Sequence, residues 1–182
     1  MNAQAAYGLL AHGLIFGALV ALLPLGPLRA RAALIASTIA LAAGIAPAMH
    51  GAFGTPSATL LQLAILQLAG RTSSPMTTRP AAGLLLFVAL FYPAALGWGP
   101  FDPYAAGYQP WMLLAAMVPL AAALIWRRLD AWLIILAIDL LAYSTGLFTN
   151  LWDALLDPLL VLLALAIVLR RAWLAFSASR TR

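Results

Sequence analysis

Asp139 has the clearest potential for chemistry in this sequence, because it lies near the middle of a long apolar segment. A charged aspartate at the centre of a bilayer costs about 2.5–3.5 kcal/mol on insertion scales. No arginine lies at that depth, so the carboxyl must be protonated, hydrogen-bonded inside a bundle, or facing water. Tyr143 follows one helical turn later on the same face. Two interpretations remain open: a carboxyl that binds a proton or a substrate, and a neutral carboxyl that joins helices.

His12 and Asp157 form a second candidate pair, in the first and last apolar segments. Each lies about four residues, or roughly 6 Å, outward of the middle of its segment, so a contact between them is possible. A His–Asp pair would fix the tautomer of the imidazole and could relay a proton. The alternative, which we favour, is that His12 packs beside the small residues Gly13 and Gly17.

Three more ionisable residues, His50, Asp102 and Asp153, fall toward the same predicted outer face as Asp157. Only there could several acid–base groups converge. Their spacing matches no metal-ligand pattern, and Asp102 and Asp153 each have a simpler role as the N-cap of a helix. We therefore expect no metal and no cofactor. Pro158 should kink or restart the last segment, because proline cannot donate a backbone hydrogen bond.

Sequence motifs of catalysis are missing. The chain has no Gly-x-Ser-x-Gly, no His-Glu-x-x-His, no phosphate-binding loop and no dinucleotide fingerprint. It has no cysteine, which excludes disulfides, a thiolate nucleophile and thiolate metal sites. The sequence therefore predicts no catalytic residue.

The elements that position these residues follow from the composition. Of the 182 residues, 65% are hydrophobic and 8% are charged, against about 25% charged residues in a soluble domain. The apolar residues fall in long blocks, so the predicted solvent is lipid and the predicted fold is a single all-α membrane domain over residues 1–182. The absence of lysine beside abundant alanine, leucine and arginine suggests a GC-rich bacterial genome.

The arginines indicate how the chain crosses the membrane. Every one follows an odd-numbered apolar segment, so seven crossings place all ten on one side. The positive-inside rule makes that side cytoplasmic, with the N-terminus outside and the C-terminus inside. Short arginine clusters between apolar blocks do not resemble a phosphate-binding groove, so we expect no nucleic acid. The seven segments are 6–28, 32–50, 56–70, 80–98, 110–126, 129–148 and 153–169.

Segment 56–70 is the weakest of the seven. It spans only about 22 Å and carries Gln62 and Gln67, so it either crosses where the bilayer is thin or re-enters on the same side. We favour crossing, because a re-entrant segment would put Arg29 and Arg31 opposite the other arginines. Prolines at the start of this and two other segments agree with helix N-termini.

Two further patterns concern packing. In the loop 99–109, aromatic residues recur at helical spacing after Asp102, which predicts either a short helix at the membrane surface or an irregular loop with ordinary interfacial aromatics. Small residues at four-residue spacing, Gly13 and Gly17 in one segment and Ala36, Ala40 and Gly44 in the next, allow close helix contacts.

Three classes of function remain open. The leading hypothesis is a non-enzymatic subunit or accessory protein of a larger membrane assembly, because the loops are short and no motif is present. The second is a small proton-linked transporter that uses Asp139. The third is an enzyme in the membrane or at its outer face, using His50 and the outer aspartates. In each case the expected partners are the lipid bilayer and other membrane-protein subunits, in a bacterial inner membrane.

Overall fold

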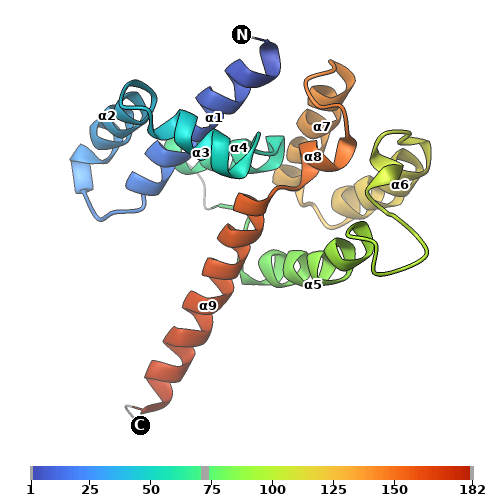
Figure 1. Cartoon of the computed structure of the whole chain (residues 1–182). Coiled ribbons are helices and arrows are strands. Elements are labelled where there is room, and N and C mark those ends of the chain that lie inside the picture. The colour runs from blue at the N-terminus through green and yellow to red at the C-terminus, as the bar shows by residue number, and fades with distance from the viewer. Residues whose placement is uncertain (1, 71–73, 181–182) are drawn as a thin grey trace.

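The computed structural model of this chain describes residues 2–70 and 74–180. Within these ranges its regular structure is helical and includes no strand, as predicted. Arg71 and Arg182, two of the arginines counted above, lie outside the described residues. Figure 1 shows α1 Ala3–Val20, η1 Gly26–Leu28, α2 Arg29–Ala42, α3 Ile45–Phe53, α4 Ala58–Ala69, α5 Thr78–Ala95, η2 Ala105–Gly107, α6 Trp111–Trp126, α7 Asp130–Ser144, α8 Leu151–Leu155 and α9 Pro158–Arg180.

Three helical stretches are long and apolar enough to cross a membrane: Ala3–Val20, Thr78–Ala95 and Leu151–Ser179. A fourth candidate span is the bent pair Gly26–Ala42 and Ile45–Phe53. The helices α4, α6 and α7 have 12, 16 and 15 residues, fewer than the roughly 20 of a usual span. The chain is therefore an all-helical protein with several candidate membrane spans.

The predicted apolar segment 32–50 is not one helix, so that prediction is wrong. Gly44 adopts a left-handed conformation, with φ of 79°, and separates α2 from α3. The two helices meet at a bend of 73°. Glycine reaches this conformation without the steric cost that a side chain would bring. Gly44 therefore ends a helix, whereas we expected it to extend a contact stripe.

The last segment restarts at a proline, as predicted. The short helix α8 ends at Leu155, and α9 begins at Pro158. Asp157 lies just before that proline, and its Oδ1 accepts the backbone N–H of Leu160 at 2.9 Å. A carboxylate before a proline at the first position is a favoured helix start. Figure 1 shows α9 extending away from the other helices toward the C-terminus.

The N-cap of α8 is Asn150, so the assignment of that role to Asp153 is wrong. The Asn150 Oδ1 accepts the backbone N–H of Trp152 at 2.8 Å, and its Nδ2 donates to the Tyr104 carbonyl at 3.1 Å. Asp153 lies in the first turn of the helix and accepts the Tyr104 hydroxyl at 2.9 Å. Burial, together with Asp153, raises the pKa of the Tyr104 hydroxyl. These bonds fix the loop 99–109 against α8.

That loop contains one 3-10 turn, Ala105–Gly107, so the predicted surface helix is wrong and the irregular loop is correct. The N-cap of this turn is Tyr104, so the assignment of that role to Asp102 is wrong; the Asp102 Oδ1 instead accepts the Tyr104 N–H at 2.9 Å in the turn just before it. The aromatic side chains do not form one face: Tyr104 is held by Asp153, whereas Phe101 is exposed. The contacts with α8, and not the helical spacing of the aromatic residues, therefore determine the conformation of this loop.

Close packing of α1 on α2 agrees with the predicted small-residue contacts. A Cβ on Gly17 would lie 2.8 Å from the carbonyl oxygen of Ala33 and would clash with Ser37 Oγ. Ala36 and Ala40 of α2 are buried. The backbones of the two helices therefore approach each other at Gly17, as small residues permit in membrane proteins.

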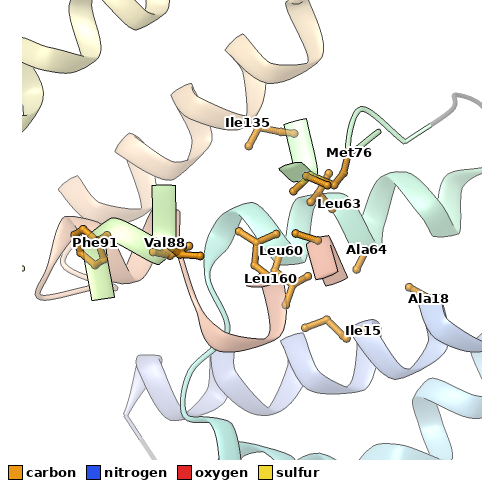
Figure 2. Packing of buried hydrophobic residues seen from close by; sticks show 13 residues of the cluster. Ile15, Ala18, Leu60, Leu63, Ala64, Met76, Val88, Phe91, Ile135 and Leu160 are labelled. Atoms are coloured by element: carbon orange, nitrogen blue, oxygen red, sulfur yellow. The ribbon is translucent and has the colours of Figure 1, made fainter. Parts of the chain in front are cut away.

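A buried apolar cluster joins five helices and includes residues of α1, α4, α5, α7 and α9. In Figure 2, Ile15 of α1 and Leu160 of α9 lie beside Leu60 of α4, and Ile135 of α7 and Val88 of α5 approach from other directions. The short helix α4 is thus central to the fold. Its packing positions the polar groups described next.

Candidate functional site

Asp139 is buried, 1% exposed, and joins α7 to α4. Its Oδ2 accepts the hydroxyl of Thr59 at 2.6 Å, and its Oδ1 accepts the side-chain amide of Gln62 at 2.8 Å. The Gln62 amide also donates to the Ile135 carbonyl at 3.2 Å. Both partners of the carboxyl are therefore neutral side chains.

This arrangement accommodates both protonation states of Asp139. When the carboxyl is charged, it accepts from both Thr59 and Gln62. When Oδ2 carries a proton, that proton can be donated to Thr59 Oγ1, because a hydroxyl accepts as well as donates. The Gln62 amide continues to donate to Oδ1 in either state. Asp139, Thr59 and Gln62 therefore each keep a hydrogen bond in both states, and in the protonated state the Thr59 hydroxyl accepts from the carboxyl and no longer donates to it.

A second polar group lies around the segment 54–57, which connects α3 to α4. The Nε2 of His12 and the Nδ1 of His50 lie 3.0 and 3.1 Å from the same Gly54 carbonyl oxygen. The two rings meet edge to face, with centroids 5.8 Å apart. Because a carbonyl accepts only, both of these nitrogens must carry hydrogen. Gly8 brings α1 close enough for the pair, since a Cβ there would lie 2.5 Å from the His50 ring.

Asp157 ties the same segment to α9. Its Oδ2 accepts the backbone N–H of Ser57 at 2.7 Å, in addition to the bond that its Oδ1 accepts from Leu160. The Ser57 hydroxyl accepts the N–H of Leu60 and caps α4. One carboxylate therefore secures the first turns of two helices that are 100 residues apart in sequence.

Two buried polar atoms in this region have no hydrogen-bond partner within the described part of the chain: the hydroxyl of Tyr7 and the Nδ1 of His12. Asp157 is close enough to Tyr7 and His12 for its charge to act on both, and Asp139 acts on Tyr7 as well. The polar groups of α1, α7 and α9 therefore lie near one another around the start of α4.

The residues predicted from sequence are only partly brought together. His12 lies near Asp157, but each bonds to backbone groups of the segment 54–57, and no hydrogen bond joins them in residues 2–70 or 74–180. Tyr143 does not bond to Asp139, and packs instead in an apolar group with Phe148 and Leu151.

The predicted outer-face cluster does not form as one group. His50 is held at Gly54, whereas Asp102 accepts the backbone N–H of Tyr104 and Asp153 accepts its hydroxyl. No group of three or more histidine, cysteine or acidic residues among the described residues could hold a metal ion.

An apolar cleft of about 530 Å³ lies against Asp139. Asp139 and Thr59 contribute its polar lining, and of the lining residues Asp139 is the ionisable one. Its other lining residues are Met76, Pro80, Gly83, Leu84, Phe87, Leu120, Leu124, Leu129, Trp132, Ile135, Leu136, Leu155 and Leu160. His12 and Asp157 are not part of the lining, so the three acid–base residues do not share this cleft.

Sequence reasoning missed Thr59, Gly54 and Tyr7 as members of the site. Thr59 and Gln62 are three residues apart and therefore lie on one face of α4, which is a signal for a shared polar partner. Gly54 contributes only its backbone carbonyl, and side-chain patterns carry no information about such a contact.

Fold and site together define an all-helical protein with candidate membrane spans, a buried carboxyl and an apolar cleft. Comparisons with protein-family models, curated proteins and solved structures find no match.

Proposed function

We propose that this chain is a multi-pass inner-membrane protein that works as a small proton-linked carrier, with Asp139 as its protonatable group. One observation carries the proposal: a buried carboxyl, held by neutral partners that serve both of its protonation states, lies against an apolar cleft. Buried acids in membrane segments are commonly part of proton or substrate pathways. The site favours this function over the membrane subunit that the sequence alone favoured.

A membrane subunit stays the second candidate, and α6 supports it. Leu113 is the one buried residue of this helix, while Trp111, Met112 and Trp126 are each more than four-fifths exposed. Such a helix presents its apolar side chains to lipid or to another membrane protein. The third class, an enzyme that uses His50 with the outer aspartates, has no support from the site, because these residues are held apart.

The proposed topology has seven crossings, with the arginines in the cytoplasm. We expect reporter fusions after Arg31, Arg128 and Arg171 to report a cytoplasmic position, and fusions near Thr55 and Gly107 a periplasmic one. A cytoplasmic signal at Gly107 would overturn the arrangement. The same signal at Thr55 alone, with Arg31 still cytoplasmic, would show that neither segment 32–50 nor segment 56–70 crosses the membrane.

Exchanging Asp139 for asparagine tests the proposal that this carboxyl carries a proton. The amide keeps the size of the carboxyl and can still accept a hydrogen bond, but it cannot titrate. We expect Asp139→Asn to insert and fold, with its melting temperature in detergent near that of the wild type, and to lose proton movement. The measurement is the internal pH of proteoliposomes, reported by a trapped dye, after an external acid pulse.

Thr59→Val is the matched variant for this experiment. It keeps the shape of the side chain and removes the hydroxyl that serves both protonation states. We expect it to slow proton movement while Asp139 stays present. An Asp139→Asn protein that moves protons as fast as the wild type would retire the carrier and leave Asp139 as a residue that joins α4 to α7.

A further inference from the structure

We propose that the cleft beside Asp139 binds lipophilic cations, which exchange with the proton on its carboxyl. This inference rests on the proposed function and names the class of its substrate. It combines the shape of the cleft, the chemistry of its lining and the sign of its ionisable group.

Shape and lining favour a bulky apolar molecule. The volume of about 530 Å³ lies within the range of about 300–1,000 Å³ that small-molecule sites occupy. Apart from Asp139 and Thr59, the lining is apolar, and it includes two aromatic rings, Phe87 on α5 and Trp132 on α7. Aromatic faces attract cations within about 6 Å of the ring centre. A molecule with apolar groups around a positive charge matches these surfaces.

Charge favours a cation over an anion. Asp139 is one of the lining residues, although it is only 1% exposed. Attraction does not require contact, because charges that are partly shielded from water still interact over several ångströms. Tyr7 on α1 is also a titratable group close to Asp139, and its hydroxyl is ordinarily neutral.

Two arginines lie next to lining residues of the cleft in the sequence. Arg79 and Arg128 adjoin the lining residues Pro80 and Leu129 in sequence. Leu129 and Asp139 are ten residues apart, or about 15 Å along a helix. Arg128 is therefore well separated from Asp139 along α7. We expect a cation to be held beside Asp139 and not beside Arg128.

Proton exchange follows from charge balance. A protonated Asp139 leaves the region neutral, and so does a carboxylate with a monovalent cation beside it. A cation that enters while the carboxyl is protonated is stabilised when the proton leaves to water, and the reverse step returns the proton. No other reactant is needed, and each bound cation replaces at most one proton.

Tetraphenylphosphonium and tetraphenylborate provide the test, because they have the same shape and opposite charge. Binding of each to the protein in nanodiscs of zwitterionic lipid is measured by calorimetry, with empty nanodiscs subtracted. We expect saturable binding of the phosphonium and release of up to one proton in weakly buffered solution. Asp139→Asn should weaken phosphonium binding at least about tenfold.

Two glycine variants distinguish binding in the cleft from binding elsewhere on the protein. A Cβ at Gly83 or at Gly51 meets nothing within 4 Å, so both positions accept leucine without a clash at the Cβ. Gly83 lines the cleft and Gly51 does not. We expect Gly83→Leu to abolish phosphonium binding and Gly51→Leu to leave it unchanged.

Equal binding of the phosphonium and the borate would overturn the inference and would identify an apolar groove for lipid chains. A loss of phosphonium binding in Gly51→Leu as large as in Gly83→Leu would overturn it as well. If the phosphonium does not bind while the wild type still moves protons and Asp139→Asn does not, the inference fails and the carrier stands. If Asp139→Asn moves protons like the wild type, the carrier itself fails, whatever binds in the cleft.

Discussion

Asp157→Ala should destabilise the protein by about 2–5 kcal/mol, and we expect it to be the most damaging removal of a single carboxyl. Its two oxygens accept the N–H groups of Ser57 and Leu160, and the residue is buried. Alanine would leave both donors unsatisfied, at about 1–3 kcal/mol each, and would remove a helix cap. The measurement is the free energy of unfolding in mixed micelles, by denaturant titration.

Asp130→Ala is the matched control. Asp130 lies in the first turn of α7, is exposed, and makes no side-chain cap bond. Its loss should change the free energy of unfolding by less than about 0.5 kcal/mol. The loss of unfolding free energy in Asp157→Asn should fall between those of Asp157→Ala and Asp130→Ala, because one amide oxygen replaces two carboxylate acceptors. A stable Asp157→Ala protein would mean that the starts of α4 and α9 do not depend on this carboxylate.

Gly17→Leu should be the second most damaging change. A Cβ at Gly17 already meets the carbonyl oxygen of Ala33 at 2.8 Å, and backbone cannot rotate away as a side chain can. The longer leucine would force α1 from α2, and overpacking of this kind costs about 1–3 kcal/mol or more. The melting temperature in detergent should fall clearly below that of the wild type.

Gly51→Leu is the control for this position too, because its Cβ would enter open space. Replacing a helical glycine there should be neutral or stabilising, by up to about 1 kcal/mol. Ala18 would be an unsuitable control, since it is buried in the apolar cluster. Equal melting temperatures for the two leucine variants would show that Gly17 does not mark a close contact.

Local signals in the sequence predicted much of the fold. The proline after Asp157 predicted the restart of the last segment. Proline cannot donate a backbone hydrogen bond, and the resulting break in the helix is local and therefore visible in the sequence. Gly17 predicted a close helix contact for a similar reason. The break at Gly44 was missed because an isolated glycine in an apolar run looks the same whether it extends a contact or ends a helix.

Tertiary contacts explain what the sequence could not predict. Asn150 and Asp153 are both good helix caps, and the choice between them depends on the Tyr104 hydroxyl and carbonyl, about 50 residues away in sequence. Asp139 was identifiable by its depth in an apolar segment. Its partners, Thr59 and Gln62, became known only when α4 was placed against α7.

Infrared difference spectroscopy of Asp139 is the most direct test of a proton-linked carrier. Spectra of the folded protein in lipid are recorded as the bulk pH is changed, for the wild type and for Asp139→Asn. We predict a protonated-carboxyl band from a buried acid that rises as the pH falls, is missing in the asparagine variant, and shifts when Thr59→Val removes its partner. Spectra of the wild type and Asp139→Asn that match at every pH would contradict the account, because Asp139 would then hold one protonation state throughout.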